Sequence, residues 1–179
     1  MITDEERKRY HRQILLFGEA GQEKLKAARV LIAGAGGLGT VIATYLAAAG
    51  VGSLRVADCD VVEESNLNRQ ILHWGLDVGR PKTTSAAEKL LALNGLIHVE
   101  EVAGRIDQEN VDALVRGCDL IVDGMDNFPT RYLLNRTAVA MGIPFIHGAV
   151  RGMYGQAMTV LPGKTPCLRC LFPGSPPPE

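Results

Sequence analysis

Three glycines and one acid carry the clearest chemical signal in this 179-residue chain. Gly34-x-Gly36-x-x-Gly39 follows a short β-prone run and opens a helical window, so backbone N–H groups and a helix N-terminus can face an anion. Asp58 ends the next apolar run, 19 residues after Gly39, where a carboxylate can accept hydrogen bonds from ribose hydroxyls. These residues predict a nucleotide-binding site, and NAD, FAD and ATP would all fit it. The alternative is that the glycines only let a helix pack closely on a sheet.

An amide-rich run and two cations favour a triphosphate at this site. Asn66-Leu67-Asn68-Arg69-Gln70 offers amide donors and a guanidinium to phosphate oxygens. Lys82 follows Pro81 at a predicted helix start, where a cation costs ~0.3–1 kcal/mol against the helix dipole, so we expect an anion beside it. Charge-assisted hydrogen bonds of ~1.5–3 kcal/mol each from Arg69 and Lys82 would shift the preference toward ATP. The alternative is that both are solvated surface cations.

A second acid follows the fourth apolar run, in Asp123-Gly124-Met125-Asp126-Asn127. Asn127 suits the cap of the helix that begins after it. Asp126 would lie at the same carboxyl edge of the sheet as the phosphates. Two such anionic groups can lie close together when Mg²⁺ is bound between them. We therefore expect Asp126 to be a magnesium ligand.

These residues sit between alternating strand-like and helix-like segments. Strands are predicted at residues 29–33, 53–57, 97–102, 120–123 and 144–147. Helical windows lie at residues 38–49, 81–93, 108–115 and 130–141. A capping-box pattern at Thr3 and Glu6 opens a short helix, and residues 22–28 favour a second one. The alternation predicts an α/β fold, a Rossmann-like doubly wound and mainly parallel sheet with helices on both faces.

The chain is expected to form one nucleotide-binding domain over residues 1–179. N-terminal helices at about residues 3–28 precede the sheet, residues 153–160 add a hairpin-like strand, and residues 172–179 form an extended tail. Residues 30–54 carry no charge, but six glycines interrupt them, so they favour strand, turn and helix over a membrane span. The polar, acidic start shows no secretory signal, which predicts a cytoplasmic protein.

Composition excludes several classes of protein. Hydrophobic residues make up 46% of the chain and charged ones 22%, which is typical of globular domains and not of disordered chains. The formal net charge is −1, so no overall basic field exists to bind nucleic acid or an anionic membrane surface.

Four cysteines without a signal peptide indicate thiol or metal chemistry and not a disulfide framework. Cys167-x-x-Cys170 has the spacing of half a structural zinc site, which normally needs four ligands. A redox role for this pair is the alternative. Cys59 and Cys118 lie in or beside the predicted sheet, where we expect them to be buried as small hydrophobes.

Seven motifs follow one another along residues 8–171: Tyr10-His11-Arg12-Gln13-Ile14, Gly34 to Gly39, Asp58-Cys59-Asp60, Asn66 to Gln70, Gly79-Arg80-Pro81-Lys82, Asp123 to Asn127, and Cys167-Leu168-Arg169-Cys170. Their ordered succession resembles the ThiF/MoeB/HesA family, the bacterial relatives of ubiquitin-activating enzymes. The resemblance implies an enzyme that uses Mg-ATP to adenylate the C-terminal glycine carboxylate of a ubiquitin-like sulfur-carrier protein ending in Gly-Gly, with release of pyrophosphate.

The resemblance also implies a role for each residue. Gly37 would lie against the phosphates, Asp58 would bind the ribose, and Asp126 would hold Mg²⁺. Arg12 would reach the ATP site of the other subunit of a homodimer. The triphosphate would be gripped by Asn66, Arg69 and Lys82. The other expected nucleotide contacts are Gly34, Gly36, Gly39, Asp60, Gln70 and Asn127, and the expected catalytic set is Arg12, Arg69, Lys82 and Asp126. We expect Lys82 and Asp126 to be exposed at the site.

The chemistry agrees with these residue types. A carboxylate is already deprotonated at neutral pH, so its attack on the α-phosphorus needs charge neutralisation and positioning and no general base. The four histidines are accordingly expected to be surface or packing residues: His11, His73, His98 and His147.

Other interpretations stay open at this point. Relatives carry a second Cys-x-x-Cys further downstream, and no cysteine follows Cys170 here, so a covalent cysteine step is not expected. A non-catalytic nucleotide-binding member is one alternative. A nicotinamide-dependent oxidoreductase would explain the glycine turn and Asp58 but would leave Arg69, Lys82 and Asp126 without tasks. A related branch of the family activates a carboxylate bound to tRNA.

Overall fold

The computed structural model describes residues 1–174 and is built on one six-stranded sheet. Its order is β3-β2-β1-β4-β5-β6. The first five strands are parallel and β6 runs antiparallel to β5. The strands are β1 (Arg29–Ala33), β2 (Ser53–Asp58), β3 (His98–Ala103), β4 (Leu120–Asp123), β5 (Phe145–Arg151) and β6 (Tyr154–Val160).

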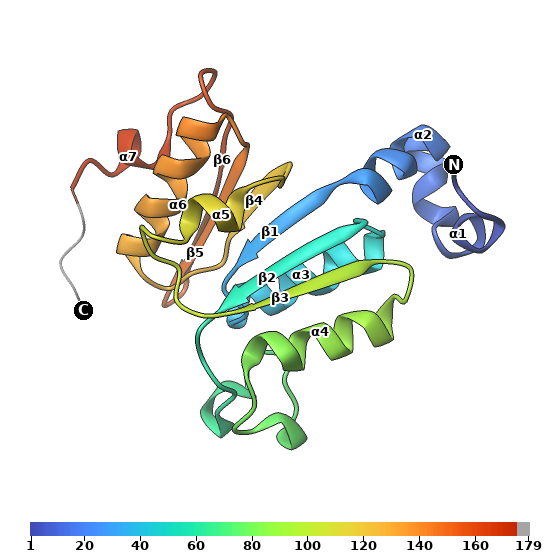
Figure 1. Cartoon of the computed structure of the whole chain (residues 1–179), viewed down its shortest axis with the longest axis horizontal. Coiled ribbons are helices and arrows are strands. Elements are labelled where there is room, and N and C mark those ends of the chain that lie inside the picture. The colour runs from blue at the N-terminus through green and yellow to red at the C-terminus, as the bar shows by residue number, and fades with distance from the viewer. Residues whose placement is uncertain (175–179) are drawn as a thin grey trace.

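Helices connect the successive parallel strands and cover the sheet on both faces (Figure 1). Two helices, α1 (Asp4–Arg9) and α2 (His11–Ala27), precede the sheet. The others are α3 (Gly37–Ala49), α4 (Lys82–Leu93), α5 (Val111–Val115), α6 (Phe128–Met141) and α7 (Leu168–Leu171), with the short 3₁₀ helices η1 (Glu64–Asn66) and η2 (Gly75–Asp77) between β2 and α4.

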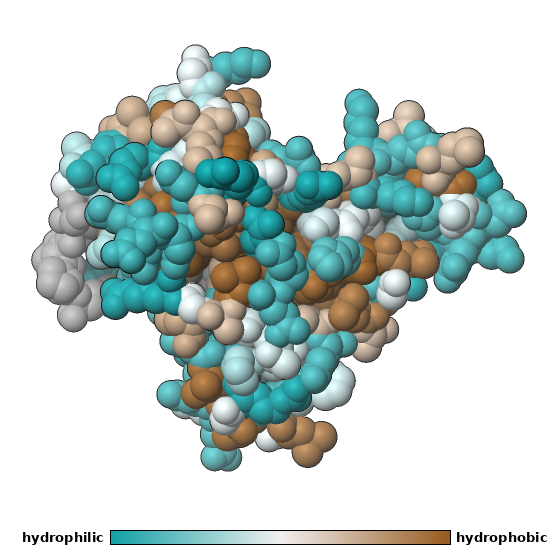
Figure 2. All heavy atoms as spheres, in the orientation of Figure 1, coloured by the Kyte–Doolittle hydropathy of each residue, from teal (hydrophilic) through white to brown (hydrophobic). Residues whose placement is uncertain are grey.

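Two hydrophobic cores lie on opposite faces of the sheet. One joins Leu54 of β2 to Ala43 of α3 and Leu90 of α4, and the other joins Leu31 of β1 to Leu134 of α6. Fully burying a Leu side chain stabilises the fold by ~1.5–3 kcal/mol. Figure 2 shows hydrophobic residues gathered across the middle of one face, over β1–β3, between polar surfaces on either side. The doubly wound, mainly parallel sheet predicted from the alternation is confirmed.

The predicted elements occur, with differences at their ends. Thr3 and Glu6 form the capping box of α1 as expected, with the Thr3 hydroxyl accepting the Glu6 N–H at 3.2 Å. The second helix is longer than predicted because α2 begins at His11, although Gly18, with φ of 72°, interrupts it. The strand predicted at 144–147 continues to Arg151 because it pairs with β6 along its length, which confirms the hairpin. Of the predicted tail 172–179, residues 175–179 lie outside the described residues.

The carboxyl ends of the parallel strands form the edge where a ligand is expected. Ala33 of β1 is in register with Ala57 of β2 and with Asp123 of β4, and Asp123 is in register with His147 of β5. Asp58 pairs with Ala103 at the end of β3. The helices α1 and α2 lie at the opposite, amino end of the strands (Figure 1). Across the described residues, no helix is long and apolar enough to cross a membrane.

Candidate nucleotide site

The glycine turn joins β1 to α3 and has space only for hydrogen at two positions. Gly34 has a φ of 95°, and a Cβ on it would lie 2.9 Å from the carbonyl oxygen of Gly124. A Cβ on Gly39 would lie 1.8 Å from the carbonyl oxygen of Gly34. The turn therefore packs against the end of β4 and against its own helix. α3 begins at Gly37, and its N-cap Gly36 supplies no side-chain cap, so the first amides of the helix remain available to an anion.

Asp58 adjoins this turn, and its carboxylate is already oriented. Oδ2 accepts the Ala35 N–H at 2.7 Å, and Oδ1 accepts the Asp60 N–H at 2.8 Å. A carboxylate has about four lone-pair sites, so Asp58 retains the capacity to accept two more hydrogen bonds. The predicted position of Asp58 beside the glycine turn is confirmed, while its contact with a ribose stays a prediction.

Lys82 has its anion within the chain itself. Its Nζ donates to Oδ2 of Asp60 at 2.7 Å, and its backbone N–H donates to the Asp60 carbonyl at 3.0 Å. The hydrogen bond from Lys82 holds the pKa of the Asp60 carboxyl below its usual value. Lys82 is only 5% exposed, so the expectation of an exposed lysine is wrong. The reason is that the loop after β2 folds back across the start of α4, which sequence spacing does not reveal.

Arg69 and Gln70 lie directly over the glycine turn. The side-chain carbons Cγ and Cδ of Arg69 lie 3.8 and 3.9 Å from the position of a Cβ on Gly37, and Gln70 Nε2 lies 3.7 Å from that of a Cβ on Gly36. The Arg69 guanidinium is exposed and donates to the Ser65 carbonyl at 3.0 Å. Gln70 is buried, and its Oε1 has no hydrogen-bond partner within residues 1–174. A buried polar atom without a protein partner has the capacity to bind a water molecule or a ligand group.

Asn66 has a structural task in the same loop. It is buried, and its Oδ1 accepts the Glu63 N–H at 3.2 Å in the cap of η1. The amide nitrogen donates to the Ser65 hydroxyl at 3.4 Å. Its predicted grip on a triphosphate stays a prediction.

Asp126 is exposed, as expected, on the loop that follows β4. This loop meets the glycine turn where Gly124 packs on Gly34. Asn127 Nδ2 donates to Asp126 Oδ1 at 3.3 Å, and Asn127 Oδ1 caps α6 by accepting the Thr130 N–H at 3.0 Å. The helix-cap interpretation of Asn127 is thus confirmed, and its contact with a nucleotide is not tested by the geometry.

A buried polar cluster supports the Asp126 loop from below. Asp123 Oδ1 accepts the Met125 N–H at 2.9 Å, and Arg131 donates to the Met125 carbonyl. His147 Nδ1 lies 2.6 Å from Asp123 Oδ2, and its Nε2 lies 3.0 Å from Gln156 Nε2. Because the amide nitrogen is a donor, the His147 proton lies on Nδ1 and points to Asp123. His147 is fully buried. The pair was not predicted, although Asp123 ends β4 and lies in register with His147 on the neighbouring strand β5.

The other histidines divide into two kinds. His11 and His98 are exposed, as predicted. His73 is buried beside the glycine turn, with Nε2 2.9 Å from the Ala35 carbonyl oxygen and Nδ1 2.9 Å from Ser85 Oγ. Its burial agrees with the expectation of a packing residue, but its hydrogen bond to the glycine turn was not predicted. The available signal was its position three residues after Gln70 in the motif-bearing loop.

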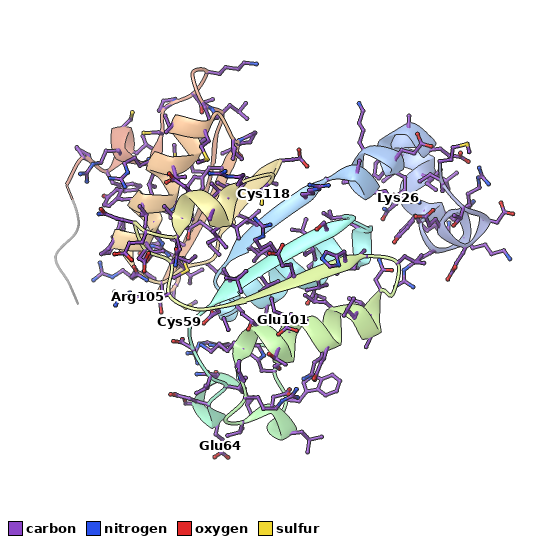
Figure 3. The ribbon with its side chains drawn as sticks, viewed as in Figure 1. Lys26, Cys59, Glu64, Glu101, Arg105 and Cys118 are labelled. Carbon is purple, nitrogen blue, oxygen red and sulfur yellow. The ribbon has the colours of Figure 1, made fainter. Side chains whose placement is uncertain are left out.

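The cysteines correct one expectation and leave another untested. Cys59 is exposed just after the carboxyl end of β2, before the loop that leads to Glu64 (Figure 3), so its predicted burial is wrong because the chain has already left the sheet. Cys118 is partly buried, as expected. Sγ of Cys167 and Sγ of Cys170 lie 3.7 Å apart. Within residues 1–174 no third His, Cys, Asp or Glu joins them as a metal ligand.

Arg12 does not join this chain's own site. It is exposed on α2, at the amino ends of the strands. Its predicted contact with the site of a second subunit remains a prediction.

Together, these features define the class of protein. Strand order reverses between β1 and β4, the connecting helices α3 and α6 lie on opposite faces, and the glycine turn sits at this switch point. This arrangement is a Rossmann-type nucleotide-binding domain. The model of the ThiF family matches residues 10–179, and the chain belongs to that family. The resemblance drawn from the motifs is confirmed.

The proteins that this chain resembles are longer than the chain itself. The SAMP-activating enzyme E1 of Haloferax volcanii is 51% identical over 172 residues, which cover 95% of this chain and 63% of the relative. A sulfur carrier protein adenylyltransferase of Thermus thermophilus is 49% identical, and the match covers 98% of this chain and 68% of the relative. The solved structure of E. coli MccB with ATP has a TM-score of 0.83 at 33% identity over 90% of this chain and 51% of that one. The chain thus spans about half to two thirds of these proteins.

Proposed function

We propose that this chain is the nucleotide-binding part of an ATP-dependent adenylyltransferase. Its substrate would be the C-terminal glycine carboxylate of a ubiquitin-like sulfur-carrier protein, and pyrophosphate would be released. The observation that carries the proposal is the position of Arg69 and Gln70 directly over a glycine turn that also binds Asp58. The names of the relatives, an activating enzyme and a sulfur carrier protein adenylyltransferase, support it.

The residues present fit ATP and a magnesium ion. The first amides of α3 are free, the side-chain carbons of Arg69 lie against Gly37, and Gln70 Nε2 lies beside Gly36. Asp126 is an exposed carboxylate on the loop that touches Gly34, and it would hold Mg²⁺. Magnesium bound there would neutralise phosphate charge.

The reaction follows from charge and alignment. The carrier carboxylate attacks the α-phosphorus, a new C(=O)–O–P bond forms, and the bond from the α-phosphorus to the pyrophosphate oxygen breaks. Arg69 and the α3 amides would lower the repulsion between the two anions and stabilise the charge that develops on the phosphate oxygens. Lys82 would add to this effect if it shared its charge between Asp60 and the phosphates. No proton has to be removed from the nucleophile, so the buried, hydrogen-bonded His147 and His73 are not needed as bases.

Further parts of the proposal concern assembly. The enzyme would be a cytoplasmic homodimer in which Arg12 of one subunit completes the ATP site of the other. Cys167 and Cys170 would supply two ligands of a zinc site. Partial burial raises the pKa of the Cys167 thiol, but hydrogen bonds from Asn135 and Cys170 outweigh that effect and lower it, which favours a thiolate ligand.

Two measurements test the proposal. Isothermal titration with Mg-ATP and with NADH separates an adenylyltransferase from an oxidoreductase, and we expect binding of ATP alone. ATP–pyrophosphate exchange stimulated by a Gly-Gly-ended carrier tests the reaction. Binding of NADH with no response to ATP would contradict the proposal. Intact ATP binding with no exchange in the full-length protein would indicate a non-catalytic member.

A further inference from the structure

His73 links the loop between β2 and α4 to the glycine turn. Its Nε2 lies 2.9 Å from the carbonyl oxygen of Ala35, and both residues are buried. The N–H of the same Ala35 donates to Asp58 Oδ2 at 2.7 Å. The two peptide groups that flank Ala35 are thus held from opposite sides, one by the carboxylate at the end of β2 and one by the imidazole.

The surrounding hydrogen bonds determine which ring nitrogen carries the proton. A carbonyl oxygen only accepts, so Nε2 must be protonated and donate to it. Lys89 Nζ donates to Ser85 Oγ at 3.2 Å. The Ser85 hydroxyl can in turn donate a hydrogen bond to His73 Nδ1, 2.9 Å away. Lys89 is in turn paired with the buried carboxylate of Asp77. The row Asp77, Lys89, Ser85, His73 therefore presents the Nε2–H of His73 toward the turn. Burial lowers the pKa of His73, which favours the neutral imidazole.

The direction of the Ala35 carbonyl determines the direction of a nearby hydrogen-bond donor, the Gly36 N–H. In a trans peptide the C=O of Ala35 and the N–H of Gly36 point in opposite directions. Holding that oxygen with His73 therefore directs the Gly36 N–H, which belongs to the N-cap of α3. His73 also belongs to the loop that carries Arg69 and Gln70, so the same bond sets the distance of both side chains from the turn.

We propose that His73 is a positioning residue of the nucleotide site, which orients the Ala35–Gly36 peptide and fastens the Arg69-bearing loop to it. The proposal rests on the proposed function only in naming ATP as the ligand. The imidazole does not touch the reacting atoms. It acts through the glycine turn on one side and through Ser85 and α4 on the other.

Three variants of the chain test this role. His73→Phe keeps the ring volume and removes the donor, and His73→Gln places an amide nitrogen near the position of Nε2 and restores it. His98→Phe is the matched control, because His98 is exposed at the start of β3. We expect His73→Phe to weaken Mg-ATP binding on the order of tenfold, as loss of one buried hydrogen bond does, and His73→Gln to recover most of it.

A second readout does not depend on ATP. Amide resonances of Ala35 and Gly36 in the ¹⁵N–¹H spectrum should move in His73→Phe and return toward wild type in His73→Gln. Should His73→Phe fail to fold, Ser85→Ala, which keeps the imidazole but removes the partner of Nδ1 and one acceptor of Lys89, should move the same two resonances. Wild-type ATP affinity in His73→Phe, or unmoved Ala35 and Gly36 resonances in the folded variants, would overturn the proposal. A wild-type protein without exchange activity would contradict the adenylyltransferase function and leave this test intact.

Discussion

Replacing Gly39 with alanine tests whether steric overlap or helix propensity decides the effect on stability at this position. In α3 an alanine gains ~1 kcal/mol over glycine in intrinsic propensity, so propensity alone predicts a more stable protein. The structure predicts the reverse, because a Cβ on Gly39 would lie 1.8 Å from the Gly34 carbonyl oxygen. That atom belongs to the backbone, and no side-chain rotation can relieve the overlap.

The magnitude follows from these two effects. Overpacking costs ~1–3 kcal/mol, and a rigid backbone contact belongs at or beyond the upper end of that range. After subtraction of the propensity gain, the free energy of unfolding should fall by about 2 kcal/mol or more. For a chain of this size the midpoint of thermal unfolding should fall by about 4–8 °C.

The assay compares Gly39→Ala with two matched substitutions by circular dichroism. Gly75→Ala adds a Cβ that meets nothing within 4 Å, and Gly37→Ala adds one in ordinary contact with Arg69 at 3.8 Å. We expect both to melt with the wild type, whereas Gly37→Ala should weaken Mg-ATP binding at least tenfold by placing a methyl group where phosphate meets the helix. A Gly39→Ala protein that melts within about 1 °C of Gly75→Ala would refute the steric reasoning.

Three further predictions concern the acids. Asp126→Asn should abolish exchange without lowering the melting midpoint, because the side chain is exposed; exposed Asp112→Asn serves as its control. Asp60→Asn should lower the free energy of unfolding by ~1–3 kcal/mol, since buried Lys82 loses its charged partner, and excess Mg-ATP should recover part of this loss in melting experiments if Lys82 reaches phosphate. Burial alone would raise the pKa of Asp77, but hydrogen bonds from Lys89 and the Trp74 N–H lower it to about 2. Because this folded-state pKa lies below the ordinary value of ~3.9, the stabilisation is present above about pH 5 and is lost as the pH falls toward 2. Urea unfolding at pH 7 and pH 3 should show a larger loss for wild type than for Asp77→Asn, and equal losses would contradict the assignment.

Local patterns were enough to predict the elements and the centre of the site. The run of β-prone residues before Gly34, the glycines themselves and Asp58 occur within single βαβ units, where short-range spacing decides what lies together. The strand bounds at 29–33 and 120–123 agree with the structure. The strand predicted at 144–147 is longer in the structure, because β5 pairs with β6 and this pairing satisfies its backbone hydrogen bonds. Local propensity does not encode such pairing.

The amino-acid sequence by itself determined the alternating fold, the glycine turn and the types of side chain available to bind a nucleotide, because these depend on residues close together along the chain. Only the tertiary structure decided that Lys82 is buried against Asp60, that His73 holds the Ala35 carbonyl and that Asp123 pairs with His147. Each of these contacts joins segments that meet only when strands and crossover loops assemble at one edge of the sheet. Their energies depend on burial and direction, and both arise only once the chain has folded.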